Sequence, residues 1–281
     1  MSYSTFSLTV EDQVAHLVLC RPEKLNSLTL AFFQELYTVC HELGRQREVR
    51  ALIISSTGKH FTAGLDLMAL GALAADLSDG ERSRAAYTLR SCVRELQDSI
   101  SAVEKLRIPV IIATHGGCIG GGVDLATACD LRYCTHDAFF CVQETNVGLV
   151  ADLGTLQRLP KLIPDGIARE LCLTGRRLSA ERALALGLVS AVFPDQETML
   201  REVKQTAKEI AGKSPLVVAG IKDVLNFGRD HGVQQGLDYV AVWQAGMLSA
   251  QDIMEQAAAK GSGRAPAYQD LPPPKDLVRL K

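Results

Sequence analysis

Two loops and three acidic residues are the parts of this sequence whose residue types could do chemistry. The loops span residues 60–67 (HFTAGLDL) and 116–122 (GGCIGGG). Three consecutive glycines permit backbone conformations and close approaches that side chains would block, and the start of a helix concentrates unpaired N–H groups. Two such loops could converge on one oxygen atom and stabilise negative charge there.

The acidic residues are Asp124, Glu144 and Asp152, each in largely apolar surroundings. Each also has a simpler interpretation: Asp124 could complement a helix dipole, Glu144 could be a solvated strand end, and Asp152 could be a helix N-cap. Val123 and Leu125 favour a buried helix start around Asp124. Burying a charged carboxylate there would cost free energy unless it had a function. The glycine run could itself be a tight strand-to-helix packing site. The residues alone leave these alternatives open.

Other chemical motifs fail on the residues present. No register of residues 116–124 satisfies the dinucleotide-binding pattern GxGxxG, and the sequence contains no GxSxG of a serine hydrolase. Gly212, Lys213 and Ser214 look like the end of a phosphate loop, but Ala207 stands where its first glycine is required. Eight cysteines without a CxxC pair, and histidines without zinc-site spacing, predict free thiols and no metal site.

The composition sets limits on partners and location. The 281 residues carry 30 Lys plus Arg against 32 Asp plus Glu, a net charge of −2 that gives no overall basic field. We therefore expect neither nucleic acid nor membrane as a partner. No apolar run reaches the roughly 18 residues of a membrane span, and the first residues do not resemble a secretory signal. We expect an intracellular protein, cytoplasmic as written, with mitochondria or peroxisomes as alternatives in a eukaryote.

The elements that must position these residues alternate between strands and helices. Strands are predicted at 14–20, 51–55, 109–114, 131–134 and 138–142, and helices at 29–43, 86–106, 180–186, 196–211, 215–227 and 232–258. Residues 1–19 read as the first strand, and residues 69–83 as a mobile helix or loop. The proline-rich tail from residue 261 is predicted to be an extended arm. This alternation indicates an α/β fold with right-handed crossovers.

Three segments resemble the enoyl-CoA hydratase/isomerase (crotonase) superfamily: 61–67 (FTAGLDL), 116–133 (GGCIGGGVDLATACDLRY) and 144–160 (ETNVGLVADLGTLQRLP). The likeness covers nearly the whole chain. It implies a spiral of ββα units with a C-terminal helical region. The implied division is an α/β core with the active site at 1–195, a helical trimerisation region at 196–260 and an extended tail at 261–281. It also implies a homotrimer or a dimer of trimers.

Within that superfamily the chain is most similar to the Δ3,5-Δ2,4-dienoyl-CoA isomerases, which have acidic residues at the positions of Asp124, Glu144 and Asp152. Typical hydratases have glutamates at the first two positions and usually glycine at the third. The resemblance implies that these three residues are catalytic. It assigns the oxyanion hole to the N–H groups of Leu65 and Gly121. The further substrate-binding positions that it implies are Ala63, Gly64, Asp66, Gly120 and Gly122, with Asp66 more typical of a turn.

The implied reaction moves two double bonds into conjugation with a thioester, as in fatty acid β-oxidation. A proton leaves C2 and one returns at C6 through a dienolate whose charge rests largely on the thioester oxygen. We assign Glu144 to C2, Asp152 to C6 and Asp124 to a supporting role, with the order of the first two open. At least one pKa should be raised, because three carboxylates in an apolar pocket cannot all ionise cheaply. No cofactor is expected, since coenzyme A is part of the substrate.

Two alternatives remain from the sequence. One is a 2-enoyl-CoA hydratase in which Asp124 and Glu144 hold a water molecule, and the other is a noncatalytic crotonase-fold protein that binds RNA or a partner. Candidates for the coenzyme A phosphates are Arg21, Lys24 and residues of the late helices, including Lys222 near Phe227. Residues 69–86 are expected to line the pocket for the acyl tail, without a readable chain-length preference. His60 and His115, which flank the loops, are expected to be structural.

Overall fold

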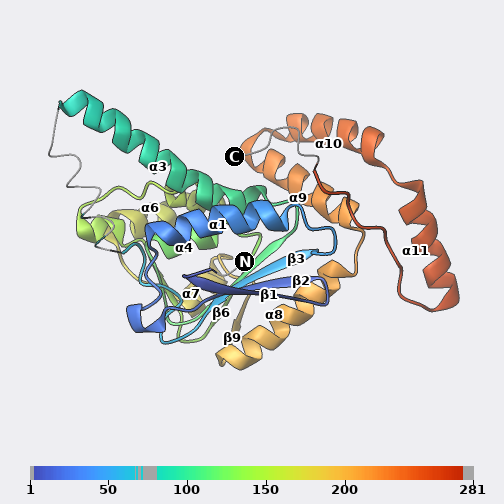
Figure 1. Ribbon diagram of the computed structural model, residues 1–281, viewed down its shortest axis with the longest axis horizontal. Coiled ribbons are helices and arrows are strands. Elements are labelled where there is room, and N and C mark those ends of the chain that lie inside the picture. Colours follow the sequence, from blue (N-terminus) through green and yellow to red (C-terminus); the bar gives the residue numbers. More distant parts are fainter. Residues whose placement is uncertain (1–2, 67, 69–70, 72–80, 275–281) are drawn as a thin grey trace.

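The computed structural model describes residues 3–66, 68, 71 and 81–274. Two sheets organise the chain (Figure 1). The larger sheet has the order β1-β2-β3-β4-β6-β9, and all its neighbours are parallel except β1 and β2. Its strands are β1 (Phe6–Glu11), β2 (Val14–Leu19), β3 (Ala51–Ser56), β4 (Val110–Thr114), β6 (Leu131–Thr135) and β9 (Ala191–Phe193). The smaller sheet consists of β5 (Gly117–Ile119), β7 (Phe139–Cys141) and β8 (Leu178–Ser179).

Helices cover both faces of the larger sheet. On one face lie α1 (Leu30–Leu43), α3 (Arg82–Lys105) and α4 (Gly121–Ala128), and on the other lies α8 (Gln196–Ala211) (Figure 1). The β3 side chains alternate between these faces, so that Leu52 joins the core under α1 and Ile53 joins the core under α8. Every residue of β3 is therefore buried.

The remaining helices lie after the glycine-rich region. They are α5 (Thr155–Arg158), α6 (Asp165–Thr174), α7 (Ala180–Ala185), α9 (Pro215–Asp230), α10 (Val233–Met247) and α11 (Ala250–Ser262), with short 3-10 turns η1 (Pro22–Lys24), η2 (Glu144–Val147) and η3 (Leu159–Lys161). Helices α9 to α11 extend away from the sheet to one side (Figure 1). Residues 264–274 form an extended arm that Arg50 ties down, donating to the Tyr268 carbonyl at 3.0 Å and to Asp270 at 2.6 Å.

The topology brings the two loops of interest together. Strands β3 and β4 are parallel neighbours, so the segments that leave their carboxyl ends emerge at the same edge of the sheet. The first segment leads to residues 60–66 and the second leads through β5 into α4. A parallel bridge joins Thr62 to Cys118, with Thr62 N–H donating to Gly117 and Ile119 N–H donating to Thr62. The loops are thus hydrogen-bonded to each other.

Several predicted boundaries are wrong, for local reasons. Within the predicted strand 1–19, residues 6–19 form a hairpin rather than one strand, because Asp12 and Gln13 turn the chain with φ values of 49° and 65°. The predicted helix 232–258 is two helices, since the chain breaks at Leu248 and the Ser249 side chain caps α11. Helix α8, which follows residue 195, packs on β3, β4 and β6. The division into three regions stays a prediction.

The segment 69–83 lies largely outside the described residues, and α3 already begins at Arg82. All eight cysteines are free, and most of them are buried. Within the described ranges, no helix is both long enough and apolar enough to cross a membrane. The same ranges contain no cluster of three or more His, Cys, Asp or Glu side chains able to hold a metal ion.

Candidate active site

A cavity of about 640 Å³ lies where the two loops meet. Its chemical lining contains all three predicted carboxyl residues, Asp124, Glu144 and Asp152, together with Leu65 and Gly121. Most of the remaining wall is apolar, with side chains from α3 and from the segment after η2. The other lining residues are Ser27, Ala63, Gly64, Asp66, Leu89, Val93, Leu96, Gly120, Gln143, Val147, Leu149, Val150 and Leu153. The structure therefore brings together residues separated by up to about half of the chain.

The N–H groups of Leu65 and Gly121 are the available donors at this cavity. Leu65 forms a parallel bridge with Leu28, in which the neighbours of Leu65 make the hydrogen bonds, so its own N–H points away from that partner. Gly121 is the first residue of α4, where N–H groups lack intrahelical acceptors. Among the described residues neither N–H has an acceptor. Both N–H groups are therefore left for an acceptor outside the described chain, such as a bound ligand.

Glycine is required where the loops turn and touch. Gly64 has φ +90°, and a Cβ there would lie 2.9 Å from the Ile119 carbonyl oxygen. Gly120 has φ +51°, and its Cβ would lie 3.3 Å from Oε1 of Glu144. Left-handed backbone at both positions, with no room for a side chain, lets the two donors approach the cavity. Gly122, a predicted substrate-binding position, fits the simple packing interpretation instead. It lies against Thr62, and it is not one of the described residues that line the cavity.

Asp124 is a buried carboxyl held in one orientation. It lies in the first turn of α4 and is only 1% exposed. The backbone N–H and the hydroxyl of Thr155 both donate to its Oδ1, each at 2.7 Å. Burial raises its pKa to about 6, against the opposing effect of the Thr155 hydrogen bonds, while the nearby Asp152 charge raises it further. Asp124 thus does more than complement a helix dipole.

Glu144 has the most unusual environment of the three. It begins η2, three residues after the end of β7, and its Oε2 is buried with no hydrogen-bond partner in the described part of the chain. Burial raises its pKa to about 7, and the negative charges of Asp124 and Asp152 contribute to the rise. A solvated strand end would show neither property. A carboxyl that ionises near neutrality and offers an unpaired oxygen to a cavity is suited to proton transfer.

Asp152 lies in the loop before α5 and is the most exposed of the three. Burial of part of its side chain raises its pKa. The interpretation of Asp152 as a helix cap is wrong, because the N-cap of α5 is Gly154, with no side-chain hydrogen bond. The loop is fixed instead through its backbone, where Gln97 of α3 donates to the Asp152 carbonyl oxygen at 2.7 Å.

Asp66, His60 and His115 also lie at the two loops, where each makes hydrogen bonds within the protein. Asp66 lines the cavity but is engaged as a turn residue, accepting from Ser27 Oγ at 2.9 Å and from Met68 N–H at 3.0 Å. His60 supports the backbone, since its Nδ1 accepts from Gly117 N–H at 2.8 Å. His115 likewise contacts the Gly58 carbonyl oxygen at 2.8 Å through Nε2. These contacts give Asp66 and both histidines structural tasks at the loops.

Some candidates for binding the coenzyme A phosphates are already engaged within the protein, whereas Lys24 is exposed near the cavity. Lys222 is buried and paired with Asp130 at 2.7 Å, so it is not free to meet a phosphate. Phe227 is stacked between His231 and Tyr239. In contrast, the exposed Lys24 in η1 lies only three residues before Ser27, which lines the cavity.

Two sets of site residues were not predicted. Thr155 holds Asp124, but a threonine at the start of a short helix gives no sequence signal for such a role. Leu89, Val93 and Leu96 of α3 form an apolar stripe along the cavity. Their spacing of four and three residues is typical of one helix face, and this spacing could have identified the wall.

Comparison with known proteins agrees with this geometry. Residues 9–260 match the family model described as enoyl-CoA hydratase/isomerase. A peroxisomal Delta(3,5)-Delta(2,4)-dienoyl-CoA isomerase of Arabidopsis thaliana is 44% identical over 96% of this chain and 99% of its own. The mitochondrial enzyme of that name from Rattus norvegicus is also 44% identical, over 92% of this chain and 80% of its own. The crystal structure of an enoyl-CoA hydratase from Bacillus anthracis superposes with a TM-score of 0.84 at 29% identity, covering 95% of this chain and 99% of that one.

The fold and the cavity together define a crotonase-fold enzyme, with paired backbone donors and carboxyl groups around one site. The chain belongs to the enoyl-CoA hydratase/isomerase family. The expected fold class is confirmed. Among the relatives reported above, the two with the higher identity are named dienoyl-CoA isomerases rather than hydratases.

Proposed function

We propose that this enzyme converts 3,5-dienoyl-CoA thioesters to 2,4-dienoyl-CoA thioesters. The observation that carries the proposal is the placement of three carboxyl groups and two unpaired N–H groups around one cavity. Two acid/base groups and one site for negative charge are what a proton shift along a conjugated chain requires. The names of the relatives from plant and rat support the same substrate class.

In the proposed mechanism the thioester oxygen accepts hydrogen bonds from Leu65 N–H and Gly121 N–H. Ionised Glu144 takes a proton from C2, and the electrons spread over the dienolate towards the thioester oxygen. Protonated Asp152 then donates its proton to C6, and the double bonds settle at positions 2 and 4. A proton that passes from Glu144 to Asp152, directly or through solvent, restores the starting state.

The raised pKa values support these roles. Glu144, with a pKa of about 7, is largely ionised slightly above neutrality and can act as a base there. Asp124, with a pKa of about 6 and one oxygen held by Thr155, adds negative charge that helps to raise the pKa of Glu144. The proposed steps need neither a redox cofactor, because the isomerisation involves no net oxidation or reduction, nor a metal ion, because N–H groups bind the thioester oxygen.

The deciding experiment is an ultraviolet time course with 3,5-octadienoyl-CoA for the wild type and for Asp152→Asn. Conjugation with the thioester creates a long-wavelength band, which should grow with the wild type and be lost in the variant. A parallel 2-enoyl-CoA assay tests the hydratase alternative, which needs only Asp124 and Glu144. Hydration without isomerisation, or isomerisation that survives in Asp152→Asn, would contradict the proposal.

We further propose that the protein forms a homotrimer or a dimer of trimers. Helices α9 to α11 carry large exposed apolar side chains, which are costly to leave in water and are typical of subunit contacts. They include Val217, Ile221, Leu225, Leu237, Val242, Met247, Ile253 and Met254. A molar mass from light scattering equal to that of a single chain would contradict this proposal.

The proposed location is an intracellular compartment that holds fatty acyl-CoA thioesters. The plant relative is named as peroxisomal and the rat relative as mitochondrial, which supports the two organelles over the cytoplasm for a eukaryotic source. Imaging of the tagged full-length protein in its own cells tests this.

A further inference from the structure

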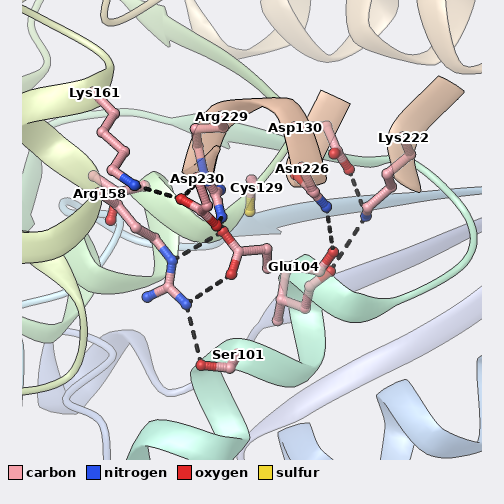
Figure 2. A network of polar contacts seen from close by, with 12 residues as sticks. Ser101, Glu104, Cys129, Asp130, Arg158, Lys161, Lys222, Asn226, Arg229 and Asp230 are labelled. Carbon is pink, nitrogen blue, oxygen red and sulfur yellow. Dashed lines mark hydrogen bonds and ion pairs between the residues drawn. The ribbon is translucent and has the colours of Figure 1, made fainter. Parts of the chain in front are cut away.

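A partly buried network of ion pairs surrounds Glu104 (Figure 2). It adjoins the loop that carries Asp152. A second cavity, of about 390 Å³, is lined by Asp152 and also by Arg158 and Glu104. Arg158 is the last residue of α5, and Glu104 lies near the carboxyl end of α3. Their side chains are only 11% and 15% exposed. Water therefore screens this ion pair weakly.

The guanidinium group of Arg158 is held in a fixed plane. Its Nε and Nη2 donate to the two carboxylate oxygens of Glu104, each at 3.1 Å, and Nη2 also donates to Ser101 Oγ at 3.1 Å. Two parallel hydrogen bonds between a guanidinium and a carboxylate fix direction as well as distance. Both partners of Nη2 come from α3, which is packed into the core (Figure 2).

Glu104 is anchored from a second side. Arg229 of α9 donates to its Oε1, and the adjacent Asp230 is paired with Lys161 (Figure 2). Burial raises the pKa of Glu104, but its hydrogen bonds and ion pairs with Arg158 and Arg229 outweigh burial and hold the pKa below its usual value. Glu104 is therefore ionised at neutral pH, and two cations share its charge.

The edge of the Arg158 guanidinium that does not contact Glu104 faces the loop 152–155. Nη1 donates to the carbonyl oxygen of Leu153 at 3.4 Å. It also fills the space beside Gly154, since a Cβ on Gly154 would lie 1.8 Å from Nη1 and the φ of Gly154 is +127°. Arg158 thus occupies the place of the missing side chain, and the path of the loop is tied to its position.

The same loop controls two of the three carboxyl groups. Asp152 directly precedes Leu153, and Thr155, which directly follows Gly154, donates both hydrogen bonds to Asp124. A shift of residues 152–155 would move the Asp152 carboxyl and loosen Asp124 at once. Arg158 itself is not among the described residues that line the substrate cavity.

We propose that Arg158, anchored by Glu104, is a positioning residue that sets the geometry of Asp152 and Asp124 through the loop 152–155. This inference rests on the proposed isomerase function, because the readout is the rate of that reaction. The competing interpretation is purely structural, in which the network only joins α3, α5 and α9. The positioning and the structural interpretation predict different values of kcat per binding-competent site when Arg158 is replaced.

The test compares Arg158→Gln and Arg158→Lys with the wild type and with Lys161→Gln. The control removes a cation of the same network that pairs with Asp230 and, in the described part of the chain, makes no hydrogen bond to the loop. Calorimetric titration with octanoyl-CoA gives the dissociation constant and the fraction of binding-competent sites. The value of kcat for 3,5-octadienoyl-CoA is then expressed per competent site.

Positioning predicts that Arg158→Gln lowers kcat roughly 100-fold, as small misplacements of reacting groups do, with the octanoyl-CoA dissociation constant unchanged. Arg158→Lys keeps the charge but loses the two parallel hydrogen bonds, and should show a smaller loss in the same direction. Lys161→Gln should retain the kcat of the wild type. If Arg158→Gln yields no competent protein, Arg158→Lys decides by the same criteria.

Other results would overturn the inference. A kcat per competent site equal to that of the wild type in the Arg158 variants would show that the network is only structural. Equal losses of kcat and of octanoyl-CoA affinity would show a general collapse of the site. A wild type that does not isomerise 3,5-octadienoyl-CoA would instead end the proposed function, so the two failures are distinguishable.

Discussion

Glu144 carries a buried oxygen without a hydrogen-bond partner and a pKa raised to about 7. Structural carboxyl groups usually gain donors when they are buried, because an unpaired buried oxygen costs free energy. The Glu144 oxygen stays unpaired despite this cost in free energy, which fits a group that must exchange a proton with a bound molecule. The neighbouring Asp124 shows the ordinary solution, with two donors from Thr155 on one oxygen.

Replacing Glu144 with Gln should therefore remove the base without changing the shape of the cavity. We expect kcat to fall by about 100- to 10,000-fold, the usual contribution of a positioned general base. The exposed Glu181 of α7 offers a matched control, and Glu181→Gln should have wild-type rates. In the wild type, kcat/KM should decrease as the pH falls below about 7, because Glu144 is then protonated. Steady-state rates across pH check both statements, and a flat profile would contradict them.

At the scale of elements, the proposed oxyanion hole depends on two backbone turns rather than on side chains. Gly120→Ala should lower kcat strongly, because φ is +51° there and the new Cβ would lie 3.3 Å from Oε1 of Glu144. Gly166→Ala in α6 is the matched control, since a Cβ there meets nothing within 4 Å. Circular dichroism with octadienoyl-CoA kinetics distinguishes a local effect from unfolding. Equal activity of both variants would mean that the turn tolerates a side chain.

The α3 helix supplies the wall that should select the acyl chain. Val93→Trp fills part of the cavity, so we expect kcat/KM to fall more for long dienoyl-CoA chains than for short ones. Arg94 lies on the solvent side of the same turn, and Arg94→Trp should leave the chain-length profile unchanged. A series of substrates with increasing chain length measures this. A uniform loss for all lengths would show that α3 does not contact the tail.

The bounds of a helix or strand were predictable where a capping residue or a glycine stands at its ends. Helix α8 begins and ends at the predicted residues, because Asp195 caps it through Thr198 N–H and Gly212 follows its last residue. The β1–β2 turn was missed because Asp12 and Gln13 adopt positive φ without a glycine. The break between α10 and α11 was missed because no proline marks it and because Gly246 lies inside the last turn of α10 rather than after its end.

The site was only partly predictable, for a related reason. Glycine loops and acidic residues stand out in a sequence, whereas a residue that only supports them does not. Gln97 bonds to Asp152 across 55 positions, and Arg158 bonds to Glu104 across 54. Such contacts depend on how α3 packs beside α5, which no local pattern contains.

At the scale of the whole molecule, the raised carboxyl pKa values link stability to pH. In the folded state Asp124 and Glu144 have pKa values of about 6 and about 7, against ordinary values of 3.8 and 4.5 for these side chains in water. The folded chain therefore binds more protons than the unfolded chain between about pH 4 and 7. Their contribution to stability is complete below the unfolded pKa values and is lost as the pH rises through the folded ones.

The free energy of unfolding should consequently be higher at about pH 5 than at about pH 8, as far as these two groups decide it. Glu144→Gln should be more stable than the wild type at the higher pH, by about 1 to 3 kcal/mol, because it has no charge to bury. Urea titrations of both proteins at the two pH values measure this. A variant that is less stable than the wild type at the higher pH would show that the Glu144 charge is compensated in the fold.

The hydrogen bonds that join Thr62 to Gly117 and Ile119 have a consequence for how this protein could be modified. The spacing of the two donors in the proposed oxyanion hole is set by main-chain bonds between neighbouring loops. Part of the apolar wall of the cavity comes instead from a separate element, one face of α3. A mutant library confined to Leu89, Val93 and Leu96 would leave the donor spacing untouched. New chain lengths could thus be selected in the laboratory while the reaction itself is inherited unchanged.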